Sequence, residues 1–164
     1  DRLNADSTAG IGDAPEPLAV ARLDAELVPF LSAAHAARLR FLPPSSDDAV
    51  FHAPKSALLQ SLAVLVKNAC EADARGGPVT LRVELDEREV AFLVEDSGPG
   101  LAPATVDRVG EPFFTTKPPG EGMGLGLYIA RMFAERLHGR LDLRPRPHGG
   151  TTARLVLPRS TLQS

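Results

Sequence analysis

The sequence predicts an α+β fold, in which a mixed, mostly antiparallel sheet carries helices on one face to form a two-layer sandwich. Two long segments, residues 54–75 and 123–138, have apolar side chains at helical spacing. Shorter segments that alternate like strands lie around them, and most follow one another through tight turns, as antiparallel strands do. With 164 residues, of which 43% are hydrophobic, the chain can bury the core of one domain.

The beginning of the chain predicts a linker, a strand and a helix. Residues 1–17 are polar and rich in Gly, Pro, Ser and Asp, which is typical of a linker. Residues 18–23 are expected to form a short strand. Residues 24–39 have apolar side chains at helical spacing, so we expect a helix with Asp24 as its N-cap and Pro29 near its first turn.

The middle of the chain predicts two short strands and the longest helix. Residues 38–42 and 50–53 alternate like strands. The helix is expected over residues 54–75 and should stop at Gly76, because glycine commonly follows a helix end. Its apolar side chains recur every three or four residues and form one stripe, made of Leu58, Leu62, Leu65 and Ala69.

The second half predicts two hairpins with a long connection and a helix between them. Residues 79–85 and 89–96 form the first hairpin, and residues 140–158 form the second. Residues 97–121 have no clear periodicity and many Gly and Pro residues, and connections of this length are often functional lids. Residues 123–138 predict the second long helix.

Composition narrows the classes of function. A net charge of −3 and an isoelectric point near 5.8 give no reason to expect a nucleic-acid binder or a membrane-surface protein. The sequence has no apolar run of about 18 residues, the length that would span a bilayer. Cys70 is the only cysteine, so an internal disulfide is impossible and a reducing, cytoplasmic location is expected. We interpret Cys70 as a buried, inert thiol rather than a redox sensor.

The stretch EDSGPG places Asp96 directly after a predicted strand, beside Gly98 and Gly100. An ionised aspartate only accepts hydrogen bonds, so it suits an exocyclic amine such as that of adenine. The two glycines let the chain turn sharply with no Cβ in the way. A plain turn is the alternative, and taken alone the motif favours the turn.

The stretch GEGMGLGL places Gly122, Gly124 and Gly126 where a helix begins. Exposed N–H groups and the positive end of the helix dipole make such a loop a phosphate cradle. Its spacing does not match the dinucleotide fingerprint, and no Gly-Lys-Ser/Thr closes it as a P-loop. A glycine hinge is the alternative.

Polar residues on the longest helix form a second candidate site. Lys67, Asn68, Glu71 and Arg75 lie on one face, offset from the leucine stripe. Asn68 is a poor helix-interior residue unless it is used, and its amide oxygen suits Mg²⁺. A solvated helix face is the alternative, which we prefer for Lys67 and Arg75.

Two further segments are expected near the same pocket. Lys117 is a cation close in sequence to the glycine cradle and within reach of a terminal phosphate. Phe113 and Phe114, in the same connection, are expected to dock it on the core. Gly150 and Thr151 open the last predicted strand and approach the pocket from there.

These motifs, in this order, resemble the ATP-binding catalytic domain of sensor histidine kinases. That domain belongs to the wider GHKL superfamily, which includes gyrase, the Hsp90 chaperones and MutL and shares the Bergerat fold. The resemblance covers residues 18–158, with residues 97–121 as the ATP lid and residues 159–164 as a tail. Residues 1–17 would then be the linker from a preceding dimerisation and phosphoacceptor hairpin. The wording EPFFTTKPPGEGMGLGL further resembles the redox-responsive, RegB-like group of sensor kinases.

The resemblance implies a role for Asn68 at the metal and for each motif residue at the adenine end. Asn68 would chelate the Mg²⁺ that bridges the phosphates. Asp96 would bind the adenine amino group, and Gly98 and Gly100 would shape the adenine pocket. Thr151, together with the glycine before it, would border adenine and its water.

At the phosphate end, the resemblance implies that a glycine loop wraps the triphosphate of ATP. Gly122, Gly124 and Gly126 would form this loop, with Leu127 beside it. Lys117 matches by position the basic lid residue that helps to hold the γ-phosphate. The expected cofactors are therefore ATP and Mg²⁺.

Two residues depart from the family pattern. Val64 stands four residues before Asn68, where many kinases have another asparagine and the ATPase branches have a catalytic glutamate. Valine takes no proton from water, which argues against a gyrase-like hydrolase. Glu71 stands where many kinases have lysine; it either contacts the groups that bind the metal or pairs with Lys67 or Arg75.

A phosphoacceptor histidine of the family type is not expected in this chain. Family acceptors are normally followed by an acidic residue, whereas alanine or glycine follows each of His35, His52, His138 and His148. The chain is therefore expected to phosphorylate a histidine on a separate dimerisation hairpin and to serve a downstream response regulator, without contacting nucleic acid or membrane. A non-catalytic nucleotide-sensing module and a GHKL-type ATPase are the alternatives.

Overall fold

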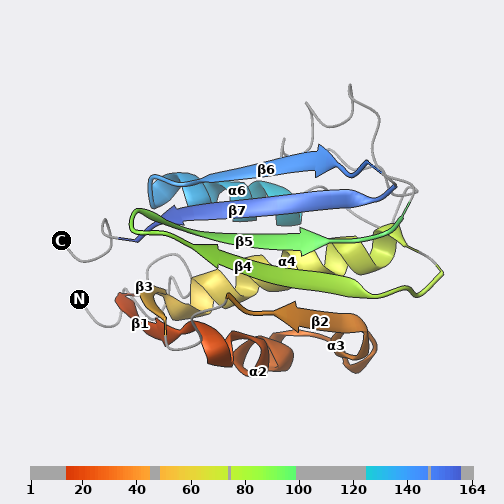
Figure 1. The fold of residues 1–164 in the computed structure, drawn as a ribbon, viewed down its shortest axis with the longest axis horizontal. Coiled ribbons are helices and arrows are strands. Elements are labelled where there is room, and N and C mark those ends of the chain that lie inside the picture. The colour runs from red at the N-terminus through yellow and green to blue at the C-terminus, as the bar shows by residue number, and fades with distance from the viewer. Residues whose placement is uncertain (1–13, 45–48, 74, 99–124, 148, 160–164) are drawn as a thin grey trace.

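The computed structural model describes residues 14–44, 49–73, 75–98, 125–147 and 149–159 (Figure 1). Within these residues, the larger sheet has five strands in the order β2-β4-β5-β7-β6, in which only β2 and β4 pair in parallel. The strands are β2 (Leu39–Leu42), β4 (Val79–Leu85), β5 (Glu89–Glu95), β6 (Arg140–Pro145) and β7 (Thr151–Pro158). The predicted mixed, mostly antiparallel sheet is confirmed.

Two long helices cover one face of this sheet. Figure 1 shows α4 (Lys55–Ala72) and α6 (Leu125–Arg136) behind the strands, and they contact each other as well as the sheet. A Cβ added at Gly126 would lie 3.1 Å from Cγ1 of Val64, so the two helices approach closely there. The two-layer sandwich with helices on one face is therefore confirmed.

The core lies between the sheet and α4. The predicted stripe on α4 is buried, since Leu58 and Leu62 are 0% exposed and Leu65 is 1% exposed. Burying one such leucine stabilises a fold by about 1.5–3 kcal/mol relative to leaving it exposed. Alternate residues of β4 and β5 face the helices, and Phe92 of β5 meets Phe51 edge to face at a centroid distance of 5.5 Å.

The first segments differ from the expected strand at residues 18–23. The strand β1 (Pro15–Ala19) starts earlier, inside the segment predicted as linker, and the 3₁₀ helix η1 (Val20–Arg22) follows it. β1 pairs antiparallel with β3 (Val50–Pro54) in a separate two-stranded sheet. The pairing partner lies more than thirty residues away, so local alternation did not reveal the register.

The prediction of one continuous helix over residues 24–39 is wrong. The segment forms α2 (Leu23–Leu27), the 3₁₀ helix η2 (Val28–Phe30) and α3 (Ala33–Arg38). Proline lacks the N–H that a continuous helix needs, so the α-helix gives way at Pro29. Ser32 starts a new helix, because its hydroxyl accepts a hydrogen bond from the His35 N–H at 3.1 Å.

Asp24 is not the N-cap that was expected. It lies inside the first turn of α2, where its carboxylate accepts a hydrogen bond from the N–H of Ala25 at 2.8 Å.

The long helix α4 ends at Ala72, before its predicted end, and Gly76 follows in a turn with φ of 81°. None of the helices that the structure describes has the length and apolarity needed to cross a membrane.

Candidate functional site

Three backbone segments meet at one end of the larger sheet: the end of α4, the exit of β5 and the turn between β6 and β7. Asp96 follows β5 directly, and its N–H donates to the carbonyl of Thr151 at 3.1 Å. A Cβ at Gly98 would overlap the carbonyl of Ala72, and a Cβ at Gly150 would overlap the carbonyl of Asp96. Gly150 also has φ of 95°, a conformation that side chains other than glycine rarely adopt. The three segments are therefore in direct main-chain contact.

Asp96 is a buried carboxylate in this junction. The residue is 4% exposed, and its Oδ1 accepts a hydrogen bond from the N–H of Gly98 at 2.9 Å. Burial raises the pKa of Asp96 above 3.8, against the lowering effects of the Gly98 and Thr151 backbone and of Arg146. The nearby Asp73 raises the pKa further. A buried acceptor of this kind suits a ligand that brings a hydrogen-bond donor.

Asp73, at the C-cap of α4, is a second buried carboxylate and is 3% exposed. Its Oδ1 accepts from the backbone N–H of Arg75 at 3.1 Å and from the Nε of Arg75 at 3.4 Å. Arg75 also donates from Nη2 to the carbonyl of Ser97 at 3.0 Å. The preferred interpretation of Arg75 as part of a solvated face is therefore incomplete, because the side chain is 80% exposed yet bridges two segments.

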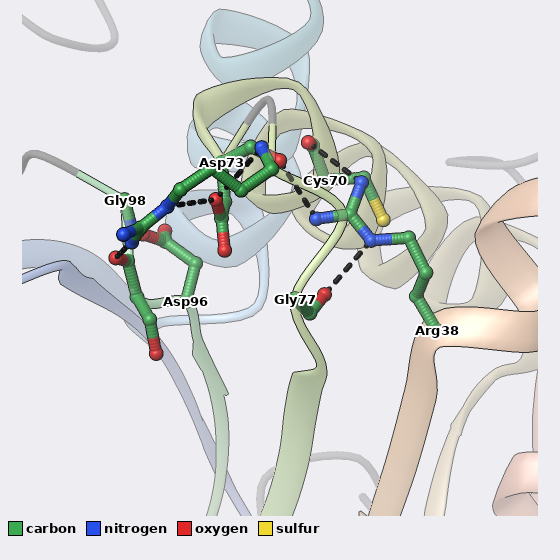
Figure 2. Close-up of polar contacts among 8 residues, drawn as sticks. Arg38, Cys70, Asp73, Gly77, Asp96 and Gly98 are labelled. Carbon is green, nitrogen blue, oxygen red and sulfur yellow. Dashed lines mark hydrogen bonds and ion pairs between the residues drawn. The ribbon is translucent and has the colours of Figure 1, made fainter.

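Arg38 holds the end of α4 from the other side (Figure 2). Its guanidinium donates to the carbonyls of Gly77 at 2.8 Å, Cys70 at 2.9 Å and Asp73 at 2.9 Å. A cation that satisfies the last carbonyls of a helix also opposes the negative end of the helix dipole. Three hydrogen bonds from Arg38 thus fix the end of α4, against which Gly98 packs.

The polar face of α4 carries Lys67, Asn68 and Glu71, whereas Arg75, which was expected on the same face, lies beyond the helix end at Ala72. Asn68 is half-buried, between the exposed Lys67 and the buried Ala69, and Glu71 is exposed one turn further on. Asn68 and Glu71 both make polar or electrostatic contacts. The exposure of Lys67 agrees with the solvated-face interpretation. Cys70 is 2% exposed and burial raises its pKa, which agrees with an inert thiol.

The other predicted site residues divide into two groups. Gly126 lies in the first turn of α6, and Leu127 is half-buried against the core. Thr151, which opens β7, is 8% exposed. The remaining ones lie outside the described residues, as does most of the expected lid: Gly100, Lys117, Gly122 and Gly124.

Sequence reasoning missed Arg38, Asp73 and Arg146. The arginines bind main-chain carbonyls that lie between 32 and 50 residues away in the chain. A carbonyl leaves no mark in the sequence, so no motif or spacing could have paired them. Asp73 and Arg75 offered a weak signal in the sequence. An acid and a base two residues apart, at a predicted helix end, can form a local ion pair.

The assembled fold and junction can now be compared with known proteins. Residues 54–161 match the family described as "Histidine kinase-, DNA gyrase B-, and HSP90-like ATPase". The chain belongs to this family. The expected family membership is therefore confirmed, whereas the RegB-like assignment stays a prediction.

Curated members of the family that resemble the chain are bacterial kinases. The sensor protein kinase FleS of Pseudomonas aeruginosa is 42% identical over 106 residues, which cover 63% of this chain and 25% of FleS. Sporulation kinase A of Bacillus subtilis is 33% identical over 113 residues, which cover 69% of this chain and 18% of that kinase. The chain thus spans about a quarter or less of the length of these relatives.

Solved structures show the same fold. The nucleotide-free catalytic domain of the histidine kinase ThkA has a TM-score of 0.76 and 27% identity, covering 88% of this chain and 95% of that one. Full-length ShkA in complex with AMPPNP has a TM-score of 0.74 and 25% identity, covering 89% of this chain and 31% of that one. The fold is that of a histidine kinase catalytic domain.

Proposed function

We propose that the chain is the ATP-binding catalytic domain of a bacterial sensor histidine kinase. It transfers the γ-phosphoryl group of ATP to a histidine on a separate helical hairpin. The observation that carries the proposal is the buried Asp96 carboxylate, held at the meeting point of α4, β5 and the β6–β7 turn. The similarity to ShkA in complex with AMPPNP supports an adenine nucleotide as the ligand.

Asp96 recognises adenine through opposite hydrogen-bonding roles. An ionised carboxylate accepts, and the exocyclic amine of adenine donates. Gly98 and Thr151 donate from the backbone to the Asp96 carboxylate, which orients it and lowers its pKa against the effect of burial. The buried setting makes this bond selective, because a base without a donor at that position would leave part of the carboxylate's acceptor capacity unused.

The phosphate end of ATP is assigned to residues of α4, which precede Asp96 in the chain, and to glycines that follow Asp96. Asn68 presents a half-buried amide oxygen from α4, with the carboxylate of Glu71 one turn away, and oxygen ligands of this kind fit Mg²⁺. When bound, Mg²⁺ supplies positive charge that offsets the charge of the phosphates. Gly122, Gly124 and Gly126 are proposed to hold the phosphates, with Leu127 beside them.

Lys117 is proposed to contact the γ-phosphate. Phosphoryl transfer depends mainly on positioning and on neutralising charge, so a domain that brings no general base of its own is chemically sufficient.

Val64 favours transfer over hydrolysis. Its side chain is half-buried and stands against Gly126 of α6, so it supports helix packing. A valine cannot activate water for attack on the phosphate. The proposed partners are therefore a dimerisation and phosphoacceptor hairpin and a response regulator, and a cytoplasmic location is part of the proposal.

The test is transfer of label from γ-labelled ATP to a panel of sensor-kinase histidine hairpins supplied in trans. Transfer to the hairpin histidine, abolished when that histidine is replaced by glutamine, is the expected result. Binding of ATP without transfer to any hairpin would favour a nucleotide-sensing module. Steady ATP hydrolysis without a hairpin would favour the ATPase alternative.

The metal assignment has its own test. Asn68→Ala should weaken ATP binding in the presence of Mg²⁺ by about tenfold, about 1.4 kcal/mol, and should leave binding without Mg²⁺ unchanged. Calorimetry with and without the metal measures both values. Lys67→Ala, at the exposed neighbour, is the matched control and should behave as the unmodified protein does. An equal loss with and without Mg²⁺ would remove the metal role from Asn68.

A further inference from the structure

Two arginines from different parts of the fold hold consecutive carbonyls where β5 ends. Arg146, in the β6–β7 turn, donates from Nη1 to the carbonyl of Asp96 at 2.7 Å. Arg75, beyond α4, donates from Nη2 to the carbonyl of Ser97 at 3.0 Å. We propose that Arg146 and Arg75 are positioning residues that fix Asp96 for adenine, an inference that rests on the proposed function. Together they are called the arginine clamp below.

Arg146 is the residue of the clamp that we expect to contribute more, because main-chain hydrogen bonds hold the turn that carries it. Its N–H donates to the carbonyl of Gly150 at 3.0 Å, and its carbonyl accepts from Gly149 at 3.2 Å. Gly150 in turn lies against the carbonyl of Asp96, which no larger residue would allow. The guanidinium therefore reaches Asp96 from a turn that main-chain hydrogen bonds hold, and its own bond to the Asp96 carbonyl is partly buried and charge-assisted.

Arg75 is the weaker arm because its side chain is largely exposed. Its Nε donates to the carboxylate of Asp73, whose side chain is 3% exposed. The main-chain carbonyl of Asp73 in turn accepts a hydrogen bond from Arg38. Exposed ion pairs contribute little to stability by themselves, so the orientation of the Arg75 side chain depends on the buried Asp73. Its bond to Ser97 secures the chain one residue beyond Asp96, at the entry to residues 99–124.

One residue of the clamp, Arg146, also influences the charge of the Asp96 carboxylate. Arg146 faces the carboxylate from the β6–β7 turn and lowers its pKa, whereas Asp73 faces it from the end of α4 and raises its pKa. Burial is the largest influence and raises the pKa. Without Arg146, the pKa of Asp96 rises further, so the carboxylate loses its charge at a higher pH.

The experiment compares Arg146→Ala, Arg146→Lys and Arg75→Ala in the whole chain, with ADP as the probe in calorimetry at several pH values. Arg146→Ala should weaken ADP binding by about tenfold at neutral pH, and its affinity should fall at a higher pH than that of the unmodified protein. Arg146→Lys keeps the charge and should restore the pH profile. Arg75→Ala should weaken binding by about two- to threefold.

A matched control exists at the other end of β5. Arg159 donates from Nη1 to the carbonyl of Asp86 at 2.8 Å, so Arg159→Ala removes the same kind of bond far from Asp96. It should leave ADP affinity and its pH profile unchanged. Thermal unfolding without nucleotide reports on the fold of each variant.

Two results would overturn the clamp. One is an Arg146→Ala variant that binds ADP with the affinity and pH profile of the unmodified protein. The other is an Arg159→Ala variant that loses as much affinity as Arg146→Ala, since the effect would then follow general stability. An unmodified protein that binds no adenine nucleotide would instead contradict the proposed function itself.

Discussion

Two aspartates mark the two ends of β5, and their turns are built alike. Asp86 precedes the strand, and its Oδ1 accepts from the N–H groups of Arg88 and Glu89 at 2.7 and 2.8 Å. Asp96 follows the strand, and its Oδ1 accepts from the N–H of Gly98 at 2.9 Å. Each aspartate carbonyl also accepts a guanidinium bond from an arginine.

The two aspartates differ in how deeply they are buried. Asp86 is exposed, and the hydrogen bonds from Glu89 and Arg88 lower its pKa. Asp96 is buried, and the loss of solvent raises its pKa in spite of similar hydrogen bonds. The same local arrangement is thus a hairpin turn at one end and a buried carboxylate, proposed to recognise adenine, at the other, because different segments pack against the two ends.

The largest expected effect comes from breaking the packing around Asp96. Gly150→Ala should destabilise the fold by about 3 kcal/mol, since it adds strain at positive φ and an overlap with the Asp96 carbonyl. Gly76→Ala shares the positive φ but would meet nothing within 4 Å, so it should cost only about 1 kcal/mol. Chemical denaturation measures both, and equal losses would show that the close approach is unimportant.

Exchanging each carboxylate for its amide tests function at the two ends. Asp96→Asn should weaken ADP binding by about 100-fold, about 2.7 kcal/mol, because the amide nitrogen replaces an acceptor that is proposed to face the adenine amine. Asp86→Asn should leave the affinity unchanged. Calorimetry at neutral pH compares them, and unchanged binding by Asp96→Asn would refute the adenine assignment.

The same two variants should change stability in opposite directions. The raised pKa of Asp96 means that its stabilising contribution is present below pH 3.8 and is lost as the pH rises through the folded-state pKa. Asp96→Asn without nucleotide should therefore be more stable than the unmodified protein at neutral pH, and the difference should shrink in acid.

Asp86 has a lowered pKa, so its contribution is present above pH 3.8 and is lost as the pH falls through the folded-state pKa. Asp86→Asn should be less stable than the unmodified protein at neutral pH. Denaturation curves over a range of pH provide the measurement. Parallel pH dependences for the two variants would contradict the contrast between the two ends of β5.

The smallest effect is expected at Cys70, which is buried near Asp96 but has no part in the proposed site. Its raised pKa and its burial predict slow reaction with a thiol reagent until the protein is unfolded. Cys70→Ala should change ADP affinity by less than about twofold. Rapid labelling of the folded protein at neutral pH would revive the redox interpretation.

Periodic patterns predicted most of the fold, because they arise within single elements. The leucine stripe placed α4 and its buried face, and the alternating segments placed the β4–β5 and β6–β7 hairpins. The segment around Pro29 was predicted less well, since apolar spacing continues through a residue that cannot continue the helix.

The sequence by itself determined the kinds of elements, the family and Asp96 as the leading candidate, since these depend on residue types and short spacings. The tertiary structure alone decided that Asp96 is buried while Asp86 is exposed, and that Arg38, Arg75 and Arg146 converge around one junction. The physical reason is that burial and arginine–carbonyl bonds depend on main-chain atoms brought from distant segments. Every residue carries the same carbonyl, so its position becomes informative only after the chain has folded.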